Sequence, residues 1–170
     1  MATDELAIST REANNRDADA ISAFLWALWN EAGSEAPGLS GATEEIIAAV
    51  ADPEAIRSRL GGPERRIYIA TQEDRVVGFA AIRAINETEI ELAGIMVLPS
   101  LTGRGIGTPL VAAAVEQARG QGFTTMSVST EVDNEAALGF YEARGFTRKS
   151  DAVVDVEGTS VTVASLELPL

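Results

Sequence analysis

Three alternating glycines, Gly103, Gly105 and Gly107, lie between a β-rich run that ends at Pro99 and a segment with helical periodicity. Glycine lets the backbone approach a ligand closely and adopt positive φ, so that successive N–H groups can point inward. Pro109 suits the first turn of the following helix, where its missing N–H is tolerated. Because the amides and dipole at a helix N-terminus favour an anion, the spacing predicts a phosphate-binding loop.

Two familiar phosphate-binding patterns do not fit this loop. A Walker loop requires Gly-Lys-Ser or Gly-Lys-Thr after its glycines, and the sequence contains neither. The dinucleotide fingerprint requires a third glycine where Thr108 stands, and a ribose-binding acid on a strand about 20 residues later, which is missing. A glycine-rich turn without a ligand is the remaining alternative, although it suits one glycine better than three.

The residue inventory restricts the chemistry. The chain has no Cys and no His, which excludes thiol nucleophiles, a Ser-His-Asp triad and the usual zinc ligands, so we expect no metal site. A net charge of −13 opposes binding to nucleic acid and suits either cationic substrates or a high-salt environment. No apolar run is long enough to span a membrane, and residues 1–12 lack signal-peptide features. We therefore expect a soluble, cytoplasmic protein without a membrane partner.

The elements that must position the loop alternate between β-rich and helical patterns, which predicts one α/β domain over residues 1–170. The expected strands are 6–11, 67–70, 76–85, 89–98, 126–128, 152–156 and 160–168. The expected helices are one with an apolar stripe at Ile21, Phe24, Leu25 and Leu28, then 43–51, 105–120 and 134–143. Asp52-Pro53 either stops the second helix or starts another short one. The strand–helix–strand order from 89 to 128 implies a parallel crossover.

The loop resembles the phosphate loop of the GNAT superfamily of acyl-CoA-dependent N-acyltransferases. In that family a strand ends in Val-x-Pro, and Arg or Gln-x-x-Gly-x-Gly or Ala then opens the central helix. Val97-Leu98-Pro99 and Gly105-Ile106-Gly107 match this signature, while Thr102 stands where the family usually has Arg or Gln. A second block, residues 134–146, is similar to the family's Asn-x-x-Ala…Tyr-Glu-x-x-Gly-Phe pattern, with Asn134 and Tyr141 at its two ends.

The resemblance implies a mixed central sheet of about seven strands flanked by about four helices. It also implies that acetyl-CoA is the co-substrate, with Asn134 at its pantetheine or diphosphate region and Tyr141 beside its sulfur. The implied coenzyme-binding residues are Ile95, Met96, Val97, Thr102, Gly103, Arg104, Gly105, Ile106, Gly107, Thr108 and Asn134.

Transfer of an acyl group to an amine needs a neutral amine, a polarised thioester carbonyl and a proton for the departing thiolate. Tyr141 is the expected general acid, because the ordinary pKa values of a tyrosine, about 10, and a thiol, about 8.5, are close. A merely packed tyrosine is the alternative. Glu91 resembles the water-assisted base of the histone-modifying members, although a solvated strand carboxylate is an equal alternative, and Glu131 is the reserve candidate.

We therefore predict direct transfer of an acetyl group to a primary amine, on a small molecule or on a protein N-terminus or lysine. A non-catalytic CoA-binding sensor or scaffold is the rival interpretation. The resemblance also allows a homodimer. Trp26, Trp29, Glu31 and Glu35 could receive a cationic amine, but residues of these types more often form partial core and solvated surface.

Overall fold

The computed structural model describes residues 7–35, 42–62, 64–156 and 158–170. Leu6, which the sequence assigns to the first strand, lies outside this part of the chain. The strands are β1 (Ile8–Glu12), β2 (Arg65–Gln72), β3 (Arg75–Ala84), β4 (Glu89–Val97), β5 (Thr125–Glu131), β6 (Thr147–Val156) and β7 (Thr159–Pro169). The α-helices are α1 (Ala18–Ala32), α2 (Glu44–Val50), α3 (Pro53–Arg59), α4 (Gly107–Gly120) and α5 (Glu135–Glu142). Short 3-10 turns occur at η1 (Asn15–Asp17), η2 (Gly33–Glu35) and η3 (Pro99–Leu101).

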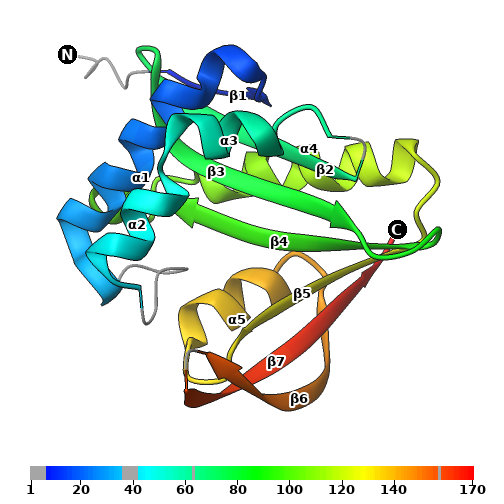
Figure 1. The fold of residues 1–170 in the computed structure, drawn as a ribbon. Helices are drawn as coiled ribbons and strands as arrows, with labels where there is room; N and C mark the ends of the chain where they lie inside the picture. The colour runs from blue at the N-terminus through cyan, green and yellow to red at the C-terminus, as the bar shows by residue number, and fades with distance from the viewer. Residues whose placement is uncertain (1–6, 36–41, 63, 157) are drawn as a thin grey trace, which may run out of the picture. The chain divides into compact units, whose positions relative to one another are not determined.

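The strands form one mixed seven-stranded sheet in the order β1-β2-β3-β4-β5-β7-β6 (Figure 1). β4 and β5 are parallel, as the predicted crossover requires, and their ladder covers three pairs, from Glu89↔Thr125 to Glu91↔Ser127. β7 runs antiparallel to both β5 and β6. The predicted α/β fold is confirmed, with five α-helices in the described residues instead of about four. The additional helix is α3, which Asp52 starts by accepting a hydrogen bond from Ala55 N at 3.0 Å.

The chain forms two compact units, and the expectation of a single domain stays a prediction. The first unit contains the described residues up to Ile82 together with Gly94–Ala114. The second contains Arg83–Ala93 and Val115–Leu170. Because β3, β4 and α4 each run through both units, the division follows packing and not the ends of elements.

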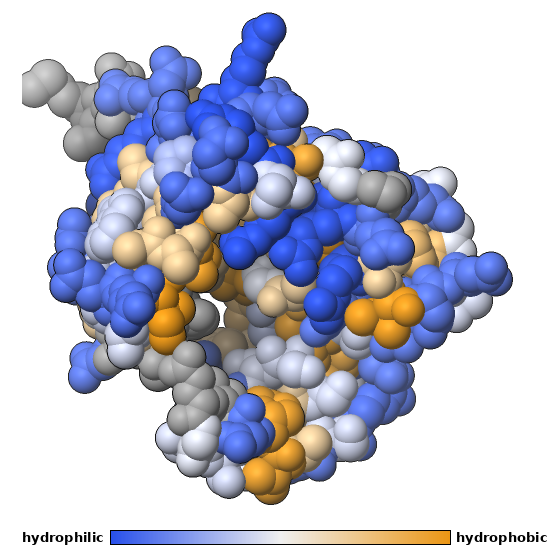
Figure 2. Space-filling view, in the orientation of Figure 1, coloured by the Kyte–Doolittle hydropathy of each residue, from blue (hydrophilic) through white to orange (hydrophobic). Residues whose placement is uncertain are grey.

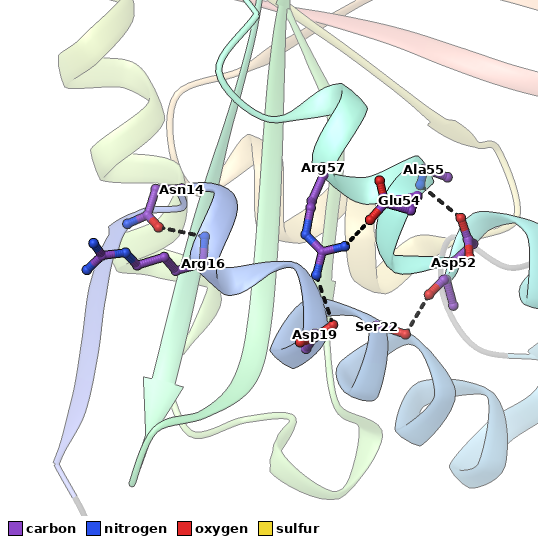
Figure 3. A network of polar contacts seen from close by, with 9 residues as sticks. Asn14, Arg16, Asp19, Ser22, Asp52, Glu54, Ala55 and Arg57 are labelled. Carbon is purple, nitrogen blue, oxygen red and sulfur yellow. Dashed lines mark hydrogen bonds and ion pairs between the residues drawn. The ribbon is translucent and has the colours of Figure 1, made fainter.

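In the first unit, α1 packs with α2 and α3 (Figure 1). The predicted apolar stripe of α1 is confirmed, because all four of its side chains are buried, namely Ile21, Phe24, Leu25 and Leu28. Arg57 of α3 forms ion pairs with Asp19 of α1 and with Glu54, and Ser22 donates to Ala51 O (Figure 3). Exposed ion pairs contribute little energy individually. Together with the buried stripe, the Arg57–Asp19 pair holds α1 against α3, and the Ser22 hydrogen bond holds it against the end of α2.

The strongest polar contact near the N-terminus joins Arg11 to Asp17. The guanidinium donates to both carboxylate oxygens, at 2.8 and 2.7 Å, and Asn14 N donates to Asp17 Oδ2 at 2.8 Å. Asp17 is the one buried charged residue in the described part of the chain. The hydrogen bonds from Arg11 are the main cause that lowers the pKa of Asp17, and burial opposes them.

In the second unit, β7 is paired along one edge with β5 and along the other with β6, and α5 contacts β6. β6 is an edge strand of the sheet and carries the most exposed large apolar side chain of the described chain, Val153, at 69%.

Hydrophilic residues cover most of the face in Figure 2, and the apolar residues on it are scattered. None of the helices in the described ranges has the length and apolar character that crossing a membrane requires.

Candidate functional site

The predicted phosphate loop begins where β4 ends at Val97. The next residue, Leu98, is buried, and its N–H donates to Val77 O on β3 at 3.1 Å. The chain then makes the η3 turn, which is closed by hydrogen bonds from Leu101 N to Leu98 O and from Thr102 N to Pro99 O. Thr102 leaves this turn in an extended conformation. The loop entry is therefore fixed to the sheet, and the glycines follow directly.

Gly103 and Gly105 have φ values of +85° and +75°, a region that side chains with a Cβ rarely adopt. A Cβ built on either glycine has no other part of the described chain within 4 Å. The backbone conformation, and not packing, therefore requires glycine at these positions. The loop residues from Thr102 to Gly105 are all exposed. The positive φ at Gly105 also explains why α4 begins at Gly107, two residues later than the periodicity predicted.

The loop exit is anchored by Ile106, which is buried. Ile106 packs on Gly78 in the middle of β3, so closely that a Cβ on Gly78 would lie 2.8 Å from Ile106 Cγ2 and 3.1 Å from Leu110 Cδ1. Gly78 therefore allows the first turn of α4 to approach the strand. This role was not predicted from the sequence, although a glycine inside a buried apolar strand often marks a close backbone approach.

The geometry of this loop fits an anionic ligand. The first turn of the 14-residue helix α4 follows the loop, and its N–H groups and dipole favour negative charge there. Pro109 lies in this first turn, as predicted. Open space surrounds the two glycines with positive φ, so a diphosphate could approach the backbone closely. Arg104 and Thr108 are exposed beside them, and the predicted β4 contacts, residues 95–97, are half-buried.

The second predicted block forms α5 and its two ends. Asn134 is the N-cap and not a helical residue, and its Oδ1 accepts a hydrogen bond from Ala137 N at 3.1 Å. The helix ends at Glu142, and the chain turns away from it at Gly145, whose φ is +94°, where Phe146 N donates back to Tyr141 O at 3.1 Å. Such a hydrogen-bonded glycine terminus is a common helix end. The Gly-Phe part of the block therefore has a structural explanation of its own.

Tyr141 is buried between two aromatic rings. Its ring centroid lies 5.4 Å from that of Phe140 and 5.5 Å from that of Phe146, and both pairs have an edge-to-face geometry. Arg144 stacks on Phe140, with its guanidinium carbon 3.5 Å from the ring centroid, and donates to Phe140 O at 2.8 Å. Burial raises the pKa of Tyr141 to about 12. The Tyr141 hydroxyl is therefore protonated throughout the physiological pH range.

Glu91 lies on β4, and its side chain is 26% exposed. Its Oε2 forms an ion pair with Arg83 Nη2 of β3 at 2.6 Å. Arg83 was not predicted as the partner of Glu91, because neighbouring strands bring the two residues together only in the fold. The reserve candidate Glu131 is the last residue of β5 and is half-buried.

The candidate residues are divided between the two units. The loop and the β4 residues Ile95, Met96 and Val97 belong to the first unit, and Glu91, Asn134 and Tyr141 belong to the second. Each unit therefore holds a group of candidate residues with its own local geometry.

Comparison with known proteins finds one family that includes both groups of candidate residues. The model of the acetyltransferase (GNAT) family matches residues 25–146. The chain is 32% identical to N-alpha-acetyltransferase 30 of Schizosaccharomyces pombe over 85 residues, which are 48% of this chain and 57% of that protein. It is 36% identical to N-alpha-acetyltransferase RimI of Mycobacterium tuberculosis over 99 residues, which are 56% of this chain and 61% of that protein. The chain thus spans less than two thirds of the length of either relative.

Solved structures share the fold over nearly the whole chain. The PaiA N-acetyltransferase of Thermoplasma acidophilum, solved with coenzyme A, has a TM-score of 0.72 at 17% identity, covering 96% of this chain and 99% of that one. A GCN5-related N-acetyltransferase of Rhodopseudomonas palustris has a TM-score of 0.70 at 25% identity, covering 100% and 99%. Since the family match runs from α1 to Phe146 and includes both motif blocks, the chain belongs to the acetyltransferase (GNAT) family.

Proposed function

We propose that this chain transfers an acetyl group from acetyl-CoA to a primary amine. The observation that carries the proposal is the loop before α4, where Gly103 and Gly105 adopt positive φ in open space directly before a helix N-terminus. This geometry suits a diphosphate, which coenzyme A contains. The family match supports the same ligand.

In this proposal the backbone amides of residues 103–108 hold the diphosphate, with Thr102 and Arg104 beside it. The Thr102 hydroxyl can donate one hydrogen bond to a phosphate oxygen, but it lacks the charge of the arginine that the family often has there. Arg104, exposed two residues further on, can supply that charge. Asn134 has its oxygen engaged by Ala137 N, so its amide nitrogen is the group left to donate to the coenzyme.

Acetyl-CoA supplies the acetyl group as an activated thioester. Tyr141 acts as the general acid for the departing sulfur in this scheme. Complete proton transfer from a hydroxyl with a pKa of about 12 to a thiolate whose conjugate acid has a pKa of about 8.5 is uphill by about 5 kcal/mol. Tyr141 therefore contributes most as a protonated hydrogen-bond donor that stabilises negative charge on sulfur as it develops.

Glu91 is the proposed base, acting through a water molecule on the attacking amine. Its ion pair with Arg83 engages Oε2, while Oε1 can accept a hydrogen bond from water. Replacing Glu91 with Gln should lower kcat at pH 7 by about 10²-fold, the lower end of the range for general base catalysis. The change Glu89→Gln, two residues earlier on β4, is the matched control, and equal rates for both variants would exclude Glu91 as the base.

Protein N-termini are the favoured acceptor class. Both N-alpha-acetyltransferases among the relatives support this choice, and the net charge of −13 favours approach of a cationic amine. Small amines are the competing class. An acceptor panel therefore needs N-terminal peptides, lysine-containing peptides with blocked N-termini, and polyamines.

The test is a thiol-release assay with acetyl-CoA and this acceptor panel. The chain contains no cysteine, so a thiol reagent detects only the coenzyme A that is released. We expect amine-dependent thiol release that Tyr141→Phe lowers about 10²–10⁴-fold, with little change in coenzyme binding. Tyr68→Phe is the matched control, because Tyr68 is the other tyrosine and its buried hydroxyl has no hydrogen-bond partner among the described residues. Unchanged turnover in Tyr141→Phe would remove Tyr141 from the mechanism.

A non-catalytic coenzyme-binding domain is the second candidate, and the substitution of Thr102 for the usual Arg or Gln favours it. This alternative predicts coenzyme binding without thiol release for any amine in the panel.

We also propose a homodimer formed through the edge strand β6, which exposes Val153 and Val154. Light scattering of the purified protein would give the mass of a single chain if this part of the proposal is wrong.

A further inference from the structure

Glu31, in the last turn of α1, forms a hydrogen bond with a residue that is distant in the sequence. Its Oε1 accepts from Ser100 N in η3 at a distance of 2.9 Å, across 69 residues. Both residues belong to the first unit, and α1 packs against η3 there. The Glu31 side chain therefore links α1 to the short turn that precedes the phosphate loop.

The η3 turn needs this acceptor because of its own sequence. Pro99, its first residue, has no N–H, and the side chain of Leu98, its N-cap, cannot accept a hydrogen bond. The N–H groups of Leu101 and Thr102 are satisfied by carbonyls within the turn. The N–H of Ser100 has no acceptor within the turn, because it lies at the start of the turn. The Glu31 carboxylate accepts its hydrogen bond and so caps the turn.

We propose that Glu31 is a positioning residue for the coenzyme loop, acting through Ser100 to fix the start of that loop. The inference rests on the proposed function, because it assumes that residues 102–108 bind the diphosphate of coenzyme A. Glu31 does not touch the coenzyme in this scheme. Its effect is on the backbone that presents Thr102 and the glycines.

The loop depends on its two ends because its middle has little restraint of its own. Gly103 and Gly105 have more backbone freedom than any other residue type, and the residues from Thr102 to Gly105 are exposed. The exit is held by the packing of Ile106 on Gly78. At the entry, Leu98 holds the strand end, and the Glu31–Ser100 hydrogen bond fixes the turn itself.

The position of Glu31 is itself well defined. It follows three helical turns whose inner side chains, including Phe24 and Leu28, are buried, and the Arg57–Asp19 ion pair ties the start of the same helix to α3. Because this packing already fixes the backbone of α1, the Glu31 carboxylate loses only the rotamer entropy of its own side chain when it binds Ser100 N.

The test compares Glu31→Ala with Glu31→Gln, whose amide oxygen can still accept from Ser100 N. Titration calorimetry with coenzyme A should give about a three- to tenfold weaker Kd for Glu31→Ala and a Kd close to wild type for Glu31→Gln. NMR-detected exchange of the Ser100 amide should accelerate in Glu31→Ala and recover in Glu31→Gln. Glu45→Ala, the loss of an exposed carboxylate on α2, is the charge-matched control and should change neither quantity.

Steady-state kinetics separate this role from direct contact with the amine. We expect Glu31→Ala to raise KM for acetyl-CoA while KM for the amine stays unchanged. A raised KM for the amine alone would identify Glu31 as an acceptor ligand and overturn the inference, and so would wild-type coenzyme affinity in Glu31→Ala. If the wild-type protein itself does not bind coenzyme A, the proposed function fails and this inference fails with it, so the two failures are distinguishable.

Discussion

Replacing Gly78 with Ala tests how the loop exit is held. The added methyl would lie 2.8 Å from Ile106 Cγ2 and 3.1 Å from Leu110 Cδ1, whereas carbon atoms in good contact are about 3.5–4.0 Å apart. The leucine methyl is at the end of a flexible side chain and can move. Ile106 Cγ2 is attached directly to Cβ, and the χ1 angle of a β-branched residue is stiff, so its backbone must move with it.

The expected cost follows from this overlap. Overpacking by one methyl costs about 1–3 kcal/mol, and each kcal/mol lowers Tm by about 2–4 °C in a chain of this size, which gives a loss of about 2–12 °C. Because Ile106 directly follows Gly105, the same displacement should weaken coenzyme A binding by about three- to tenfold. The loop would then be tested from its exit independently of Glu31.

Urea unfolding and calorimetric titration with coenzyme A measure the two effects. Gly62→Ala is the matched control, because a Cβ on Gly62 meets nothing within 4 Å in the part of the chain that the structure describes, and its φ is not positive. Its unfolding free energy should stay within about 0.5 kcal/mol of wild type. If Gly78→Ala unfolds at the wild-type urea concentration, α4 does not pack closely on β3, and the account of the loop exit is wrong.

The remaining predictions concern buried titratable groups. Burial raises the pKa of both tyrosines, Tyr68 and Tyr141, to about 12, whereas a tyrosine in the unfolded chain ionises near pH 10. The two tyrosines therefore make their full contribution to the free energy of unfolding below pH 10, and this contribution is lost as the pH rises toward 12. For Tyr141 the loss is about 3 kcal/mol, and ultraviolet titration of tyrosinate near pH 10 in the folded protein would refute it. Arg11→Ala should destabilise the fold by about 1–3 kcal/mol at pH 7. Urea unfolding should show this difference shrinking as the pH falls through the lowered pKa of Asp17, and a constant difference would contradict the assignment.

Local sequence patterns were sufficient for most of the fold. The 3.6-residue stripe of α1 and the strand–helix–strand order around α4 correctly predicted buried faces and a parallel β4–β5 pair, because both depend on neighbours in sequence. Boundaries failed where one residue's backbone decided them. Positive φ at Gly105, for example, delays the start of α4. At Asp52-Pro53 the sequence allowed either a helix stop or a new short helix, and the second alternative is confirmed because the Asp52 cap starts α3.

Contacts between distant segments were not predictable in this way. The Arg83–Glu91 ion pair, the packing of Ile106 on Gly78 and the capping of Ser100 by Glu31 join residues on different elements, and no spacing in the sequence encodes them. The pKa of Tyr141 was also out of reach, because it depends on how deeply the fold buries the ring. Residue types thus indicated the chemistry, and the fold determined which partners modify it.

Amide hydrogen exchange of the full chain, measured with and without coenzyme A, shows whether residues 102–108 bind the coenzyme. We expect slower exchange in the loop and in the first turn of α4 when coenzyme A is present, and no such protection with NAD at the same concentration. Unchanged exchange in this segment at saturating coenzyme A, or equal protection by NAD, would contradict it.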